Sequence, residues 1–238
     1  MVPRFYVDAP LRAGSSITLP ESSAHHAVHV LRLRAGDEVT LFHGRGGEFA
    51  GRIAAVERLR ISVDLLQHRA VEREAPLRIT LVQGVSAGEK MDSTVRKAVE
   101  LGVAAIQPVL ATRSVARPKG ERADSRHEHW QKVVIAACEQ CGRNRIPEVH
   151  PLVPLYDYRA GDGTKLLLSP RSELPLSRAG KSEQYIIAAG PEAGFTDDEE
   201  AALAAQGFVP VKLGARVLRT ETAALAAVAA LNVLRGDF

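Results

Sequence analysis

The chain has 238 residues, of which 45% are hydrophobic and 25% charged, and its net charge at pH 7 is +3. This composition is that of a folded globular protein and excludes a disordered chain. No run of about 20 uncharged apolar residues is present, and residues 1–8 (MVPRFYVD) lack the apolar core of a signal peptide. We therefore expect a cytoplasmic protein without a membrane partner.

Residues 1–72 are predicted to form a small β-rich domain. Two runs, 38–42 and 60–65, alternate apolar and polar residues as half-buried strands do. The cluster Gly44–Gly47 (GRGG) predicts a hairpin turn, because glycine adopts the positive φ angles that such turns require. One helix is expected over 20–31, where alanine, valine and leucine recur at helical spacing. A small barrel with one helix fits this pattern best.

A change of pattern follows residues 68–76 (HRAVEREAP), which are polar, charged and end in proline, as linkers do. From Leu77 onward, apolar strands alternate with amphipathic helices. The strands are expected at 77–82, 105–110, 165–168, 184–188 and 208–213, and the helices at 90–101, 124–141, 196–206 and 221–234. This order predicts an α/β domain over 73–238 with a mostly parallel sheet covered on both faces.

Two loops that follow predicted strands carry the residues most suited to ligand binding. In parallel sheets, ligands bind beyond the carboxyl ends of the strands. The loop Gly190–Thr196 (GPEAGFT) has two glycines that allow close backbone approach, and Thr196 is placed to cap the next helix. The loop Gly214–Ala223 (GARVLRTETA) holds two arginines, two threonines and a glutamate within seven residues, which is more than capping requires. We therefore expect a polar ligand here, with the loop after Leu168 as a further candidate.

Several other chemistries lack their signatures. Cys138 and Cys141 form a C-x-x-C pair inside a predicted helix, but nothing in the sequence completes the roughly four ligands of a zinc site. Packing of the two thiols is therefore favoured, and no metal is expected. The sequence also has no phosphate-loop, dinucleotide-binding or nucleophile-elbow motif.

The basic residues gather in one segment of the chain. Between Thr112 and Arg145 there are eight basic and four acidic residues, a net charge of +4 that exceeds the charge of the whole chain. On charge alone, a solvated helix face and a phosphate-binding surface are equally consistent with this segment.

The two ligand loops and several other segments resemble the RsmE family of SPOUT-class RNA methyltransferases. The loop at 190–195 (GPEAGF) is similar to the family's GPEGGF, and 213–223 (LGARVLRTETA) is similar to its LGxRILRxETA. Matching segments also occur at 3–5 (PRF), 25–32 (HHAVHVLR), 97–103 (KAVELGV), 130–132 (WQK) and 139–144 (EQCGRN). The departures are Ala193 for a glycine, Val217 for isoleucine and Cys141 for serine.

This resemblance implies a fold and an activity. The family has an N-terminal PUA-like β-barrel for RNA contact, here residues 1–72, and a C-terminal SPOUT domain with a trefoil knot, here 73–238. Its members transfer a methyl group from S-adenosylmethionine to N3 of a uridine in 16S rRNA of the small ribosomal subunit, and a homodimer is usual. The expected substrate form is the assembled 30S subunit.

The resemblance also implies site residues. The cofactor is expected to contact Leu168, Gly190, Pro191, Glu192, Gly194, Leu213, Gly214, Val217, Leu218, Thr220 and Thr222. Arg219 is the leading catalytic candidate, because an arginine stabilises the negative charge that develops at N3, and Arg4 is a second choice on the RNA side. Glu221 is also expected at the catalytic site, either as a hydrogen-bond acceptor or as a favourable first-turn residue of the final helix. Contacts to RNA are expected from Arg4, Arg32, Arg34, Arg113 and Arg143.

Two alternatives stay open at this point. The chain could act on another rRNA or tRNA base with the same cofactor loops, which substrate profiling would reveal. It could also be a non-catalytic RNA-binding assembly factor, although the intact loop at 217–222 argues against that.

Overall fold

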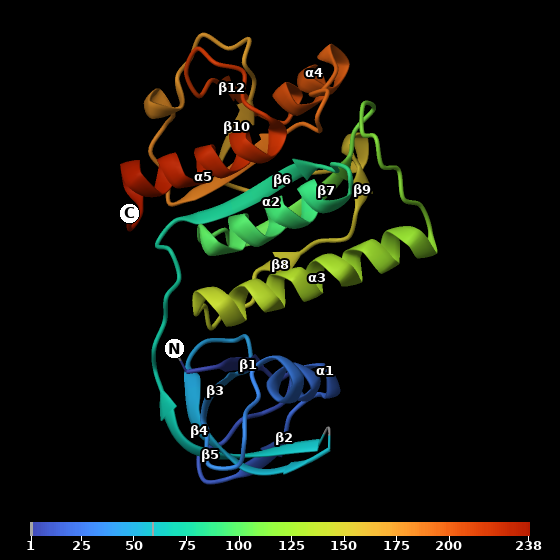
Figure 1. Ribbon diagram of the computed structural model, residues 1–238. Coiled ribbons are helices and arrows are strands. Elements are labelled where there is room, and N and C mark those ends of the chain that lie inside the picture. The colour runs from blue at the N-terminus through green and yellow to red at the C-terminus, as the bar shows by residue number, and fades with distance from the viewer. Residues whose placement is uncertain (1, 59) are drawn as a thin grey trace. The chain divides into compact units, whose positions relative to one another are not determined.

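The structure is a computed structural model that describes residues 2–58 and 60–238 (Figure 1). The chain divides into two compact units. Unit 1 runs to Glu74 and also takes in Cys138–Ile146, whereas unit 2 consists of Ala75–Ala137 and Pro147–Phe238. None of the helices in the described residues is long and apolar enough to cross a membrane.

Unit 1 contains a five-stranded sheet with the order β1-β3-β4-β5-β2. Its strands are β1 (Arg4–Tyr6), β2 (Ser16–Thr18), β3 (Glu38–Phe42), β4 (Glu48–Glu57) and β5 (Arg60–Arg69). β3, β4, β5 and β2 pair antiparallel, and β1 lies parallel to β3. Gly44, Gly46 and Gly47 all have positive φ between β3 and β4, which confirms the predicted hairpin turn.

The core of unit 1 lies between this sheet and a short helical segment. α1 (Glu21–His25) continues as a π-helix over His26–Val30, where a helix was predicted. Ala24 and Ala27 are fully buried there, against the cluster that includes Leu41 and Ile61. Burial of each large aliphatic side chain contributes about 1.5–3 kcal/mol, so this cluster holds the helix on the sheet.

Unit 2 contains a seven-stranded sheet in which every pairing is parallel. The strands run in the order β12-β10-β11-β6-β7-β8, and β9 also pairs with β7. They are β6 (Arg78–Gly84), β7 (Ala105–Leu110), β8 (Glu148–Val149), β9 (Val153–Pro154), β10 (Thr164–Leu168), β11 (Gln184–Ala189) and β12 (Val209–Val211). The helices are α2 (Gly88–Glu100), α3 (Glu121–Cys141), α4 (Asp197–Ala205) and α5 (Thr220–Arg235). The predicted mostly parallel α/β sheet is therefore confirmed.

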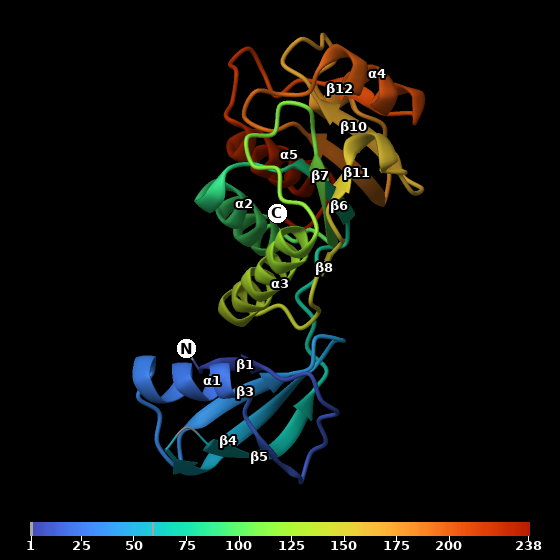
Figure 2. The ribbon, with the colours of Figure 1, turned by 90° about the vertical axis from the view of Figure 1, so that its right-hand side faces the viewer.

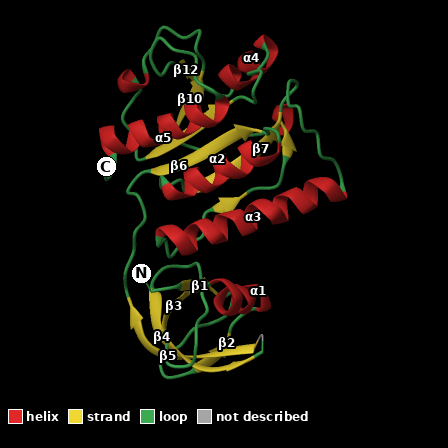
Figure 3. Cartoon of the chain, in the orientation of Figure 1, coloured by secondary structure: helices red, strands yellow, loops and turns green. Residues whose placement is uncertain are grey.

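Helices cover both faces of this sheet, because its central strands are apolar on both sides. α2 and α5 lie side by side (Figures 1 and 2), and the buried Asn232 of α5 donates a hydrogen bond to the carbonyl of Leu101 at 2.7 Å. Leu203 of α4 and Phe208 pack with Val82 in a separate buried cluster. Figure 3 shows these helices in red and the strands of the sheet in yellow.

The structure departs from the sequence predictions at short or edge elements. β5 extends through Arg69, so that the first two residues of the predicted linker at 68–76 belong to a strand. His68 and Arg69 pair with β4 through backbone hydrogen bonds, and such pairing cannot be predicted from the hydropathy pattern of polar residues. The two-residue strands β8 and β9 were not predicted, because a run of two residues has no periodicity.

Candidate active site

The loops that follow β10, β11 and β12 meet around one cavity of about 300 Å³ in unit 2. Parallel strands end at the same edge of a sheet, which brings these distant segments together. The cavity is lined by Leu168, Ser169, Pro170, Ala189, Gly190, Pro191, Glu192, Ala193, Gly194, Val211, Lys212, Leu213, Gly214, Arg216, Val217, Leu218, Thr220 and Ala223. Ten of the eleven predicted cofactor contacts are in this lining, and Thr222 is exposed outside it.

The Gly190–Thr196 loop is tightly packed at its first residue. A Cβ at Gly190 would lie 2.9 Å from the nitrogen of Phe195 and 3.0 Å from Gly194, so no larger residue fits without displacing the loop. At the other end, Thr196 and Glu199 form a reciprocal capping box at the start of α4. This confirms the predicted cap and leaves the loop fixed at both ends.

Glu192 holds the same loop from its side chain. Its Oε1 accepts a hydrogen bond from the backbone N–H of Ala87 at 3.0 Å and lies 3.6 Å from Nζ of Lys90. Burial raises the pKa of Glu192, but the N–H groups of Ala87 and Glu192 and the charge of Lys90 outweigh it, so the pKa lies below its ordinary value. Glu192 is therefore a carboxylate that ties the cavity loop to the start of α2.

A second polar contact supports the loop from β7. Arg113 donates hydrogen bonds to the carbonyl oxygens of Ala193 and Phe195, at 3.1 and 3.3 Å. The fully buried Glu199 accepts a hydrogen bond from the N–H of Thr112 at 2.6 Å. The segment after β7 thus fixes the back of the cavity loop, which is a role for Arg113 beyond the predicted RNA contact.

The Leu213–Thr222 segment is more open than the first loop. Gly214 has a φ of 97°, and the side chain of Val217 is 81% exposed. Arg219 precedes α5 in an extended conformation, between the lining residues Leu218 and Thr220. Its exposed guanidinium has no ion pair within the part of the chain that the structure describes. The side chain is therefore free to reach a substrate beside the cavity.

Glu221 lies in the first turn of α5, where the helix dipole favours a negative charge. It is not among the residues that line the cavity. One carboxylate oxygen, Oε2, is buried without a hydrogen-bond partner among the described residues. This position is consistent with support of the helix start, and direct contact with a reacting base remains a prediction.

Two of the predicted RNA contacts, Arg4 and Arg143, are engaged inside unit 1. Arg4 donates to Glu48 at 2.7 Å and to the side-chain oxygen of Asn144 at 2.6 Å, and its side chain is only 8% exposed. Arg143 is buried and forms an ion pair with Glu74. Both guanidinium groups are therefore already paired, and breaking either pair would leave a buried charge without a partner. Their contact with RNA stays a prediction. Arg32 and Arg34 are exposed.

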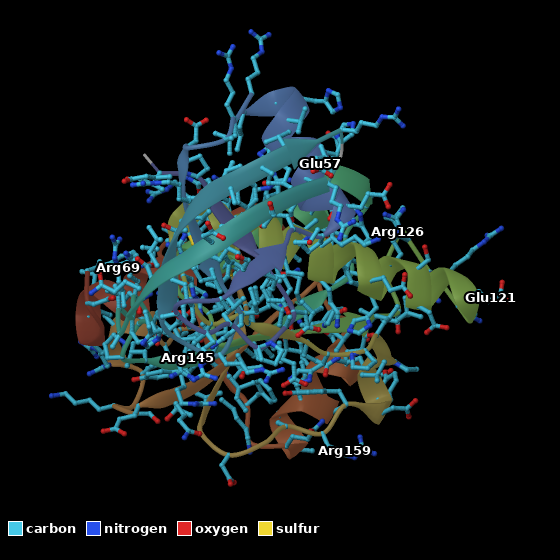
Figure 4. The ribbon with its side chains drawn as sticks, turned by 90° about the horizontal axis from the view of Figure 1, so that it is seen from below. Glu57, Arg69, Glu121, Arg126, Arg145 and Arg159 are labelled. Atoms are coloured by element: carbon cyan, nitrogen blue, oxygen red, sulfur yellow. The ribbon has the colours of Figure 1, made fainter. Side chains whose placement is uncertain are left out.

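The start of α3 and the residues before it form a groove lined by Arg117, Arg122, Arg126 and His129, among other residues. Figure 4 shows Arg126 and Glu121 on the surface of α3. His129 lies 2.7 Å from a carboxylate oxygen of Asp92. Further along the helix, burial raises the pKa of Cys138 to about 12, so its thiol stays protonated at neutral pH. Cys138 therefore behaves as a packing residue.

The sequence interpretation missed several residues around the cavity. Lys212 and Arg216 line it without having been singled out. Gln83, at the end of β6, donates a hydrogen bond to Thr220 at 3.1 Å although it lies outside the lining. A lone glutamine at the end of an otherwise apolar strand was the available signal for it.

Comparisons with known proteins identify the family of this chain. The family model described as "RNA methyltransferase domain" matches residues 73–232, and "RNA methyltransferase PUA domain" matches 19–66. Ribosomal RNA small subunit methyltransferase E of Buchnera aphidicola is 31% identical over 100% of this chain and 95% of its own length. The corresponding enzyme of Neisseria gonorrhoeae, solved with S-adenosyl methionine bound, is 40% identical over 100% of both chains with a TM-score of 0.92. A Legionella pneumophila methyltransferase, solved with the cofactor SAM, is 35% identical over 100% of both chains with a TM-score of 0.94. The chain therefore belongs to the RNA methyltransferase family whose curated members are named ribosomal RNA small subunit methyltransferase E.

Proposed function

We propose that this protein transfers a methyl group from S-adenosylmethionine to N3 of a uridine in 16S rRNA of the small ribosomal subunit. The observation that carries the proposal is the cavity built by the loops after β10, β11 and β12. Relatives at 40% and 35% identity over their full length were solved with this cofactor bound. The cytoplasm, where ribosomal subunits assemble, is the expected place of action.

The residues of the cavity fit this cofactor chemically. Leu168, Leu213, Val217 and Leu218 offer apolar surface for an adenine ring. Backbone groups at Gly190 and Gly214 can meet its polar edges, because glycine leaves the backbone accessible. When bound, the cofactor supplies an activated methyl group on a sulfonium, so the protein mainly has to position the acceptor nitrogen.

Arg219 is the residue proposed to act on the uridine. The base must leave its pairing partner before N3 can reach the methyl group. Negative charge then develops on the uracil ring, and a guanidinium beside it stabilises that charge. Arg219 lies between two lining residues and has no competing ion pair among the described residues. Glu221 is proposed to support this end of α5.

The finer features of the fold are also proposals. A trefoil knot in the loops after β11 and β12 is proposed from the family resemblance, and the hydroxyl of Thr220 donates a hydrogen bond to the carbonyl of Gly190 between these two segments. The five strands and helix of unit 1 favour a PUA-like β-barrel over residues 1–72, with the methyltransferase domain over 73–238. Three exposed apolar side chains at the C-terminal end of α5 favour a homodimer, namely Val233, Leu234 and Phe238.

RNA phosphates are proposed to meet exposed cations rather than the buried Arg4 and Arg143. Arg32 and Arg34 of unit 1 remain candidates, and Arg113 could add a contact beside the cavity loop. Phosphate binding releases counterions, so affinity for the rRNA should fall steeply as salt rises. A flat response to salt would count against this interface.

One experiment tests the reaction, the cofactor and the substrate together. The protein is incubated with S-adenosylmethionine and small ribosomal subunits that lack base methylation, and the digested RNA is analysed by mass spectrometry. New N3-methyluridine is the expected product. Methylation of another base would keep the enzyme class and replace the substrate. Absence of both methyl transfer and cofactor binding would favour a non-catalytic RNA-binding factor.

A further inference from the structure

Gln83 lies behind the cavity and contacts two of the loops that form it. It is the penultimate residue of β6, in the middle of the sheet, and its side chain is buried with 1% exposure. Its Nε2 lies 3.1 Å from Oγ1 of Thr220, 3.0 Å from the carbonyl oxygen of Gly84 and 3.4 Å from that of Gly190. The side chain therefore reaches both the loop after β11 and the start of α5.

The neighbours of Gln83 fix the orientation of its amide. Three oxygen atoms surround the group, and the carbonyl oxygens of Gly84 and Gly190 can only accept. The NH₂ end must therefore face them. The hydroxyl of Thr220 accepts from Gln83 and donates its own hydrogen to Gly190, which completes a chain of hydrogen bonds across three segments.

Packing alone does not account for a glutamine at this position. Its Oε1 is buried without a hydrogen-bond partner among the described residues, and an unpaired buried acceptor lowers stability. A leucine of similar size would fill the space without that cost. The hydrogen bonds of the NH₂ group are thus the feature that the glutamine adds.

The loop that Gln83 contacts needs such a constraint. Gly190 packs closely against Phe195 and Gly194, but glycine restricts its own backbone least, so donors to its carbonyl add to the constraint on the following peptide. The end of β6 also presses on this peptide, since a Cβ at Gly84 would lie 2.5 Å from the nitrogen of Pro191. Ala87 binds the carboxylate of Glu192 two residues further on. The connection from β6 to α2 therefore supports the cavity loop from behind.

We propose that Gln83 is a positioning residue, which fixes the Gly190 peptide and the Thr220 hydroxyl in the arrangement that binds S-adenosylmethionine. This inference rests on the cofactor proposed above. Gln83→Leu keeps the volume and removes the donor, so both loops gain freedom that cofactor binding must then restrict. We expect the Kd for S-adenosylmethionine to rise about tenfold, and kcat at saturating cofactor to change by less than about threefold.

The chain supplies a matched control in Gln107, on the neighbouring strand β7. Its side chain is also buried, and its Nε2 donates to the carbonyl oxygens of Pro108 and Pro151 at 2.8 and 2.9 Å. Gln107→Leu removes the same kind of donor from the same sheet without touching the cavity loops. It should lower the thermal midpoint about as much as Gln83→Leu and leave the Kd unchanged.

The measurements are calorimetric titration of S-adenosylmethionine, steady-state methyl transfer and thermal unfolding, with the full chain throughout. Thr220→Val tests the same hydrogen bonds from the other end, although Thr220 also lines the cavity. Should Gln83→Leu fail to fold, Gln83→Met removes the same donor with an unbranched side chain. Thr220→Ser returns the hydroxyl and should recover most of the affinity that Thr220→Val loses. The double variant Gln83→Leu/Thr220→Val should bind no more weakly than the weaker single variant, because both remove one chain of bonds.

The outcomes separate this inference from the proposed function. A wild-type protein that binds no S-adenosylmethionine overturns both. Binding by the wild type with an unchanged Kd for Gln83→Leu overturns the positioning role alone. Equal weakening by Gln83→Leu and Gln107→Leu also overturns it, since the loss would then follow general destabilisation.

Discussion

Glu48 is the carboxylate on which the buried charges of unit 1 converge, and its removal should destabilise that unit. Its Oε2 accepts hydrogen bonds from Arg4 at 2.7 Å, from Arg73 at 3.0 Å and from Asn144 at 3.3 Å. The side chains of Glu48 and Arg4 are 5% and 8% exposed. Glu48→Gln keeps the shape but leaves the guanidinium of Arg4 buried without a counter-charge.

The size of the effect follows from the pKa of Glu48. Burial raises this pKa, but hydrogen bonds from Arg73 and Arg4 and the charge of Arg4 outweigh burial and hold it at about 2, against an ordinary value of 4.5. At about 1.36 kcal/mol per pKa unit, the difference corresponds to about 3 kcal/mol. Breaking a buried ion pair costs a similar amount, about 3–5 kcal/mol. We expect Glu48→Gln to lower the free energy of unfolding by about 3 kcal/mol at pH 7.

The same argument predicts the pH dependence. The folded pKa lies below the unfolded one, so the stabilisation is fully present above about pH 4.5 and is lost as the pH falls toward about 2. The difference between wild type and Glu48→Gln should therefore shrink below pH 4.5. Urea unfolding, followed by circular dichroism at several pH values, measures this difference in the free energy of unfolding.

Two controls make this test specific to unit 1. Trp130 is the only tryptophan and lies buried in unit 2, so its fluorescence reports that unit separately and should change little. Glu38→Gln removes an exposed carboxylate 3.9 Å from Arg52 and should cost less than about 0.5 kcal/mol. Equal stability of wild type and Glu48→Gln at pH 7 would refute the reasoning, and so would a difference that persists at pH 2.

Three further variants test the site and its supports. Arg219→Ala should lower kcat by more than about 100-fold in steady-state kinetics, while the Kd for S-adenosylmethionine in calorimetry changes little. An equally large loss of cofactor affinity would contradict its catalytic role. Gly190→Ala should weaken cofactor binding by about tenfold or more in calorimetric titration, because the new Cβ would lie 2.9 Å from the nitrogen of Phe195, and wild-type affinity would contradict this. Glu199→Ala removes the capping contact to Thr196 and the acceptor for the N–H of Thr112, so it should lower the free energy of unfolding by about 2 kcal/mol in urea unfolding. A loss below about 0.5 kcal/mol would show that these contacts do not stabilise the fold.

The sequence predicted most of the fold because the central elements of unit 2 are long and strongly patterned. β7 spans the predicted residues, and α5 begins one residue before its predicted start. Because ligands bind beyond the carboxyl ends of parallel strands, the sequence also predicted which loops meet. Gly190 and Gly214, from two of these loops, both line the cavity. The short strands β8 and β9 escaped prediction because their pairing depends on backbone hydrogen bonds to β7 rather than on side-chain pattern.

The contacts of individual polar side chains were beyond the sequence. Gln83 and Thr220 are separated by 137 residues, and only the fold brings them within hydrogen-bonding distance. Arg4 and Asn144 are 140 residues apart and form a hydrogen bond inside unit 1. From the sequence motif alone, the guanidinium of Arg4 was expected to contact RNA. A motif fixes which residues are present, while long-range packing decides which of them face a ligand.

The arginines of such motifs fall into two classes, those that are buried and paired with a carboxylate and those that are exposed without an ion pair. A guanidinium that is buried and already bound to a carboxylate, as Arg4 is to Glu48, would have to break that pair before it could bind phosphate, at a cost of several kcal/mol. Arg219 carries no such cost, because it is exposed and has no ion pair among the described residues. It also sits between two residues that line the cavity. The motifs that the chain shares with this family thus contain paired, buried arginines and exposed arginines, such as Arg219, without an ion pair among the described residues. Only the exposed arginines can change their interactions during a reaction without first breaking a buried pair.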